Sequence, residues 1–366
     1  VSDSLTVGFI NMQTEDIESV APANNFTVAR VRQDLPNRSS IGGLFVNRQS
    51  TGATGLSDDY NRTYAVDGRW GLGQTGVVQG FVGKTDTPGY DGRDHAMSIS
   101  GTYDSETWRV ITGYQENGED FNPEVGFLRR RGGFRKYDFG VNNRSRPEGF
   151  LNFQELTPHA SFTRFWTLDG IMESSYAHLH FQGEFEDSSS AGVAVDPRSE
   201  RVFEAFDVSG IVIPPGRYDF NETSYRFRYD RSAPVNFGLQ YSHGGFFGGS
   251  LKTVEPSVNA RYGDTLNLSL SYSRNDIDLP GGSTVTNLTS LNLAYNFTIS
   301  LYAQTLLQHN DSDHLWAVNV RFGWLQDANT GLFLVYNEVE GIGDVIPNGA
   351  GRSLVLKFSY LFDVLD

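Results

Sequence analysis

The sequence predicts an all-β protein, a transmembrane antiparallel up-and-down β-barrel of about 20 strands, with about 18 as the alternative count. Three observations predict this fold. Apolar and polar residues alternate strictly over segments of roughly ten residues. The connections between these segments alternate between long and short. The chain of 366 residues contains no apolar run long enough for a transmembrane helix.

The alternation is clearest in the last third of the chain. A period of two places successive side chains on opposite faces of a strand. One face is large and apolar, and we expect it to contact lipid through Leu291, Leu293, Trp316, Phe322, Leu354 and Phe358. The other face is small and polar, and we expect a lumen lined by Asn292, Asn319, Arg321 and Lys357. Aromatic residues near the strand ends favour a membrane barrel over a soluble β-fold, because such girdles form at the lipid interface.

The connections predict the orientation of the strands. Short turns are expected near 34–39, 72–76, 103–107, 143–149, 186–190, 230–234, 263–265, 296–300 and 326–330. Longer loops are expected near 15–24, 49–61, 85–94, 117–133, 208–223, 244–251, 275–285, 308–314 and 338–352. Only the connection at 167–170 breaks the rhythm, because it is short where a long one is expected. Long extracellular loops and short periplasmic turns require an even strand count with both termini in the periplasm.

Composition limits the function classes. Zero cysteine excludes a disulfide framework and thiolate metal sites. A net charge of −15 argues against nucleic-acid binding, which needs a basic footprint. The chain has no Gly-x-Ser-x-Gly, His-Glu-x-x-His or P-loop motif. We therefore expect a protein that is not an enzyme and that uses no cofactor.

The densest basic cluster lies in the segment 117–133. Arg129, Arg130 and Arg131 follow one another there, and Arg135 lies just beyond. We expect this segment to fold into the lumen, where the arginines form a constriction for anionic or hydroxyl-rich solutes. The alternative is that the arginines pair with lumen carboxylates and only brace the segment.

Other strands also turn polar side chains toward the predicted lumen. The basic ones are Arg30, Arg32, Arg226 and Arg228. One further strand carries His178, His180 and Glu184 on a single face. Two histidines at i and i+2 can chelate a divalent metal, with His159 as the third ligand. A polar lumen wall explains these side chains better, so no metal site is predicted.

Three stretches of the chain carry a family resemblance. They are 7–14 together with 25–32 (VGFINMQT and NFTVARVR), 121–130 (FNPEVGFLRR) and 213–220 (IPPGRYDF). They resemble a bacterial family whose members carry a periplasmic carbohydrate-binding-family-9-like domain followed by an outer-membrane β-barrel domain of unknown function. The resemblance implies an outer-membrane location in a Gram-negative-type bacterium. The attached domain of the family suggests carbohydrate handling.

We expect residues 1–366 to form one barrel domain, without the upstream periplasmic domain of the family. Residue 1 already enters a strand, whereas an exported protein needs a signal segment. The chain is therefore expected to be a processed product.

The resulting prediction is a channel or transporter for small hydrophilic solutes, with oligosaccharides as the candidate cargo. One alternative is a plugged barrel that anchors an outer-membrane assembly, and a weaker one is a barrel hydrolase. The expected partners are outer-membrane lipid, lipopolysaccharide, a small hydrophilic solute and a protein of the assembly.

Overall fold

The computed structural model describes residues 4–17, 21–52, 55–56, 58–90, 92–128, 130, 132–312, 314–327, 330–341 and 351–361. Every regular element among these residues is a β-strand, which confirms the all-β prediction. Of the 23 strands, 21 belong to one antiparallel sheet, and β13 and β14 form a separate two-stranded sheet. The prediction of an up-and-down sheet of about 20 strands is confirmed.

The described chain contains no helix long and apolar enough to cross a bilayer. It divides into two compact units. The first comprises Val1–Arg144, Pro158–Leu179 and Arg198–Arg201, and the second comprises Ser145–Thr157, His180–Pro197 and Val202–Asp366.

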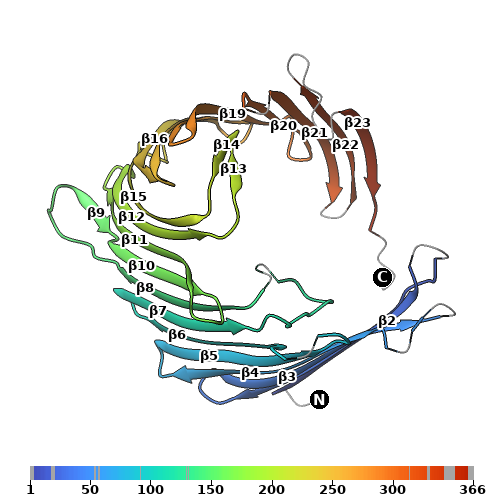
Figure 1. Cartoon of the computed structure of the whole chain (residues 1–366). Coiled ribbons are helices and arrows are strands. Elements are labelled where there is room, and N and C mark those ends of the chain that lie inside the picture. Colours follow the sequence, from blue (N-terminus) through green and yellow to red (C-terminus); the bar gives the residue numbers. More distant parts are fainter. Residues whose placement is uncertain are drawn as a thin grey trace. The chain divides into compact units, whose positions relative to one another are not determined.

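The first unit is built of strands that each pair with the preceding strand of the chain, except that β10 pairs with β8 (Figure 1). The bounds are β1 Leu5–Gln13, β2 Ala23–Leu35, β3 Ser39–Thr51, β4 Tyr60–Leu72, β5 Gly76–Asp86, β6 His95–Asp104, β7 Trp108–Asn117, β8 Phe134–Asn143 and β10 His159–Trp166. Strand β11, Met172–Phe185, and strand β12, Ser190–Val202, contribute residues to both units.

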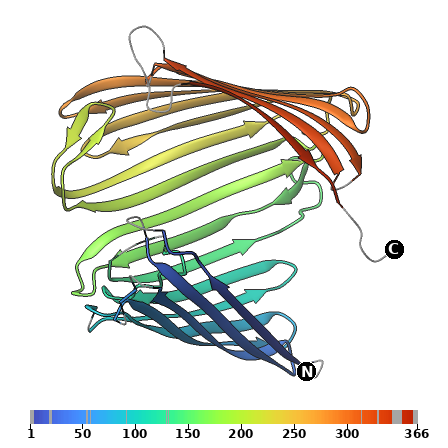
Figure 2. The same cartoon turned by 90° about the vertical axis from the view of Figure 1, so that its right-hand side faces the viewer.

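In the second unit the strands from β15 to β23 form one continuous antiparallel ladder, seen from the side in Figure 2. The bounds are β9 Phe153–Leu156, β13 Phe206–Val208, β14 Ile211–Ile213, β15 Gly216–Arg228, β16 Val235–Phe246, β17 Gly249–Tyr262, β18 Leu266–Leu279, β19 Gly282–Asn296, β20 Leu301–Asn310, β21 Leu315–Asp327, β22 Thr330–Gly341 and β23 Gly351–Ser359.

Both units expose one apolar face. In β4 the side chains of Tyr64, Val66 and Trp70 are 46%, 59% and 60% exposed. In the second unit the exposed fractions of Leu354 and Phe358 are 67% and 66%. A sheet in water buries such a face, because exposing this much apolar area is unfavourable. Contact of this face with lipid remains a prediction. The same is true of the expected lipid contacts of Leu291, Leu293, Trp316 and Phe322.

Some predicted loops are wrong. The region 275–285 was expected to be a long loop, but β18 runs to Leu279 and β19 starts at Gly282. Its Asp, Asn, Gly and Pro content is typical of a loop. However, Ile277 and Leu279 are buried, 8% and 5% exposed, because they pack against Ile211 and Ile213. The region 244–251 is likewise a tight turn between β16 and β17, and the short turn expected at 143–149 is part of a longer connection that contains β9.

Candidate functional site

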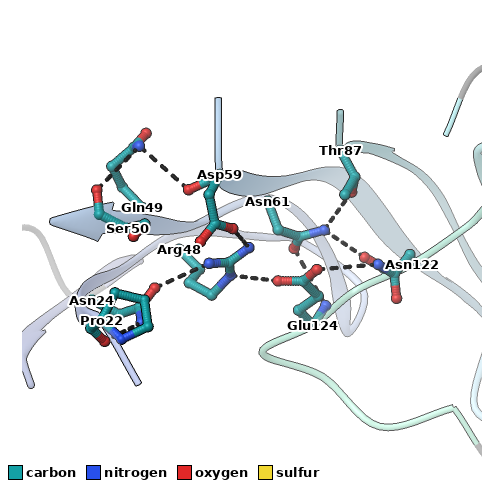
Figure 3. Close-up of polar contacts among 10 residues, drawn as sticks. All are labelled: Pro22, Asn24, Arg48, Gln49, Ser50, Asp59, Asn61, Thr87, Asn122 and Glu124. Atoms are coloured by element: carbon teal, nitrogen blue, oxygen red, sulfur yellow. Dashed lines mark hydrogen bonds and ion pairs between the residues drawn. The ribbon is translucent and has the colours of Figure 1, made fainter. Parts of the chain in front are cut away.

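The connection between β7 and β8 is anchored to the neighbouring strand ends. We call residues 118–133 the β7–β8 segment; positions 129 and 131 lie outside the described residues. Asn61 is 1% exposed and donates from Nδ2 to the carbonyl oxygen of Asn122 and to Oγ1 of Thr87, both at 2.6 Å (Figure 3). Its Oδ1 accepts the backbone N–H of Glu124 at 3.3 Å. One buried amide therefore binds the segment through two of its main-chain groups.

Arg48 forms the second anchor. It lies directly opposite Asn61 in the β3–β4 register. Its Nε donates to the Glu124 carboxylate, one Nη pairs with Asp59 at 2.6 Å, and the other donates to Oδ1 of Asn24 at 3.0 Å (Figure 3). The planar guanidinium fork can satisfy three partners at once. The hydrogen bond from Arg48 holds the pKa of the Asp59 carboxyl, which lies in the loop before β4, below its ordinary value.

The predicted arginine cluster is described only at Arg130. Its guanidinium pairs with Glu173 at 2.8 Å and lies 4.6 Å from the ring centroid of Phe165. This contact is the type that bracing of the segment requires. Arg129 and Arg131 lie outside the described residues, so their role in a constriction remains a prediction.

Arg135, which is predicted to face the lumen, lies at the start of β8. It pairs with Glu116 at 2.8 Å and lies opposite it in the β7–β8 register. Alternation puts Arg135 on the same face of β8 as Tyr137 and Phe139, which are 37% and 38% exposed. The lysine on the opposite face is Lys136. A difference of one position along the strand decides which of the two cations shares the face of the exposed aromatic rings.

Arg30 lies on the polar face of the first unit, with Arg32. Its guanidinium forms a bidentate pair with Asp67, with the second contact at 2.8 Å. Arg32 pairs with Asp34 on the same strand at 2.9 Å. Gly42 lies between the strands of Arg30 and Asp67, and a Cβ there would lie 2.7 Å from Nη2 of Arg30. Because Gly42 has no side chain, the long side chain of Arg30 has room to cross β3 and reach Asp67.

In β11, His178 and His180 lie on the face opposite Leu179, which is 53% exposed. The rings of His159 and His178 lie 5.0 Å apart between centroids, and the Tyr176 hydroxyl is 3.3 Å from Nδ1 of His178. His180 follows His178 by two residues and shares its face. Glu184, also on this face, pairs in register with another carboxylate residue, Glu155. The close imidazoles of His159 and His178 are the kind of ligand pair that binds a divalent cation.

The polar face of the second unit contains two cavities. The first has a volume of about 310 Å³ and is lined by residues of β15 to β18 and by Leu288 of β19, and the lining includes Arg226 and Arg228. The second has a volume of about 380 Å³, and its lining includes the side chains of Asn267, Ser269, Asn292, Gln304 and Asn319. Alternation alone predicted the polar face, but not that hydroxyl and amide groups of adjacent strands gather into cavities.

Comparison with known proteins supports the fold. No protein-family model matches the chain, and no curated protein matches it. Among solved structures, the siderophore receptor PirA from Pseudomonas aeruginosa is similar, with a TM-score of 0.54, 12% sequence identity, and coverage of 96% of this chain and 71% of that chain. A mutant of the ferric enterobactin receptor PfeA from the same organism gives a TM-score of 0.52 and 10% identity, with the same coverage. The chain thus has the fold of an outer-membrane β-barrel.

Proposed function

We propose that this protein is an outer-membrane barrel that transports small hydrophilic solutes, with the β7–β8 segment narrowing its lumen. The observation that carries the proposal is the polar face of the second unit. The lining of its cavities of about 310 and 380 Å³ includes amide, hydroxyl and guanidinium groups. Such groups bind hydroxyl-rich solutes by hydrogen bonds, whereas a packed apolar interior would exclude them.

The structural neighbours support the transport part of the proposal. These neighbours are a siderophore receptor and a ferric enterobactin receptor, and their ligands are small solutes. Oligosaccharides are our proposed cargo, because the resemblance to a family with a carbohydrate-binding-like domain points to them. Outer-membrane lipid and lipopolysaccharide are the proposed partners of the apolar faces, and both termini are proposed to be periplasmic.

Solute uptake into proteoliposomes tests this function. We expect liposomes that contain the purified barrel to swell in isosmotic solutions of small sugars, and to swell more slowly as the sugar becomes larger. Empty liposomes and liposomes with heat-unfolded protein are the controls. Swelling rates equal to those of the controls for every sugar would contradict the transport proposal.

A plugged, anchoring barrel is the second candidate, favoured by the anchoring of the β7–β8 segment. Phe127 in this segment is 86% exposed and offers an apolar contact to a partner protein. Replacing Phe127 by Ser distinguishes the two functions. The anchoring function predicts loss of a co-purifying protein from outer-membrane extracts, whereas the transport function predicts unchanged swelling rates.

A further inference from the structure

We infer that the cavity on the polar face of β15 to β18 is a binding subsite for an oxyanion carried on a hydroxyl-rich solute, with Arg228 as its cationic centre. This inference rests on the proposed transport function and names the chemical class of the solute. The polar-face residues that line the cavity include Arg226, Arg228, Gln240, Glu255, Ser257 and Ser271.

The two arginines of the cavity have different surroundings. Arg226 lies opposite Gln240 in the β15–β16 register and donates to its Oε1 from two nitrogens, at 2.9 and 2.6 Å. Arg228 lies opposite Gly238, which has no side chain that could accept a hydrogen bond from it. Among the described residues Arg228 has no hydrogen bond or ion pair, although it is half-buried. Arg226 is thus satisfied within the sheet and Arg228 is left available to a ligand.

A glycine keeps the space in front of Arg228 open. Gly238 is paired with Ser257, and Ser257 with Ser271 on the next strand. A Cβ at Gly238 would lie 2.8 Å from Oγ of Ser257, which is too close for a real contact. Across the strands, Arg228 is therefore followed by the glycine position, which has no side chain, and then by the hydroxyl groups of Ser257 and Ser271. This order fits a ligand with an anionic end and hydroxyls beyond it.

The charges around Arg228 favour an anion. Arg226 and Arg231, which lie two residues before and three residues after it in the chain, are both cationic. A half-buried cation among like charges is unfavourable without a counter-ion, and a bound oxyanion would accept charge-assisted hydrogen bonds from its guanidinium.

The same cavity contains one carboxylate. Glu255 lies opposite Gln240 and accepts a hydrogen bond from the Ser273 hydroxyl at 3.3 Å. A carboxylate is an acceptor only, so it recognises hydroxyl donors and repels a second anion. The combination of Arg228 and Glu255 therefore selects a solute with its negative charge at one end and hydroxyls at the other. A hexuronate or another small acidic saccharide has this arrangement.

Calorimetric titration of the purified barrel in detergent tests the inference. The probes are glucuronate, glucose 6-phosphate, glucose and inorganic phosphate. We expect glucuronate and glucose 6-phosphate to bind, and glucose to bind at least about tenfold more weakly, because it lacks the charge-assisted hydrogen bonds. Inorganic phosphate that binds as tightly as the sugar acids would overturn the saccharide class.

Three variants locate the subsite. We expect Arg228→Gln to weaken glucuronate binding at least about tenfold. Gly238→Ala keeps the charge but fills the gap, and it should also weaken binding. Arg261→Gln is the matched control, since Arg261 lies on the same face of β17, bonds to the carbonyl oxygen of Ser232 at 3.3 Å and does not line the cavity. Its affinity should equal that of the unmodified protein.

The inference is overturned if Arg228→Gln and Gly238→Ala bind glucuronate as the unmodified barrel does, or if Arg261→Gln weakens binding equally. If Arg228→Gln does not fold, as judged by its migration in unheated electrophoresis, Gly238→Ala decides the matter. Binding in detergent does not depend on passage through a pore. A barrel that binds glucuronate but never transports a solute contradicts only the proposed function, and one that transports without binding glucuronate contradicts only this inference.

Discussion

Arg30 reaches the carboxylate of Asp67 across a strand that has no side chain at the crossing point. A Cβ at Gly42 would lie 2.7 Å from Nη2 of Arg30 and 3.0 Å from the carbonyl oxygen of Val31. The first neighbour is flexible, but the second is backbone and cannot move easily. The residue type at Gly42 thus controls whether two charges on the polar face can meet.

We predict that Gly42→Val displaces Arg30 and lowers the free energy of unfolding by about 1–3 kcal/mol, chiefly through overpacking rather than through loss of a half-exposed ion pair. Urea unfolding of the barrel in detergent, followed by tryptophan fluorescence, measures this. Gly43→Val is the matched control, because the nearest atom to a Cβ there is 4.0 Å away. Equal destabilisation by both variants would contradict the prediction.

Asp59 gives the anchoring of the β7–β8 segment a dependence on pH. Arg48 lowers the pKa of Asp59 in the folded protein, below about 3.9 for an unperturbed aspartate. The stabilisation from this carboxylate is therefore present above about pH 4 and is lost as the pH falls through the lowered pKa. We predict that proteolysis of the segment by an acid-stable protease accelerates only below about pH 4, and that Asp59→Asn removes this change. A transition near neutral pH would contradict the assignment.

Under the proposed transport function, the β7–β8 segment is the element whose position matters most. Asn61 and Arg48 bind it through Asn122 and Glu124, and Arg130 pairs with Glu173 near its other end. We predict that Asn61→Ala speeds hydrogen exchange at the Glu124 amide by about tenfold or more, because that amide loses its acceptor and the segment loses a buried amide.

The control for this experiment is Asn47→Ala. Asn47 lies on the neighbouring strand β3 and accepts one long hydrogen bond, of 3.4 Å, from Arg62. We expect unchanged exchange at Glu124 in this variant. Unchanged exchange in Asn61→Ala as well would show that Asn61 does not hold the segment.

In the second unit, the small sheet of β13 and β14 forms a cap that packs on the end of β18. Ile211 and Ile213 pack with Ile277 and Leu279 in a buried cluster. We predict that Ile213→Ala, at a position 2% exposed, destabilises this cap by about 2–4 kcal/mol and speeds proteolysis between β12 and β15. Val212→Ala on the other face, at a position 62% exposed, should leave the proteolysis rate unchanged. Equal rates in the two variants would contradict the packing role of Ile213.

Local pattern accounts for most of the elements and for few of the contacts. Alternation predicts the strands around Leu291 and Trp316, because the polarity of each residue indicates which face of the strand it occupies. It fails at 275–285, where the burial of Ile277 depends on β13 and β14, far away in the sequence. In the same way, the basic composition around Arg130 could be seen in the sequence, but its partner Glu173 could not, because strand pairing decides which side chains meet.

At the scale of the whole molecule, the composition becomes understandable. A barrel wall exposes apolar side chains on one face and polar ones on the other, so the mean hydropathy of −0.37 is compatible with a membrane fold. The negative net charge and the absence of cysteine are also compatible with this fold. Under the proposed function, transport depends on the cavities of the polar face and on the β7–β8 segment.

Single-channel recording in planar lipid bilayers tests the transport function most directly. The unmodified barrel and a variant in which residues 119–132 are replaced by a short Gly-Ser linker are compared in the same salt. We predict a measurable conductance for the unmodified barrel and a larger one for the variant, because the segment is proposed to narrow the lumen. A variant that inserts, resists unfolding in unheated electrophoresis and still never opens would contradict the transport function.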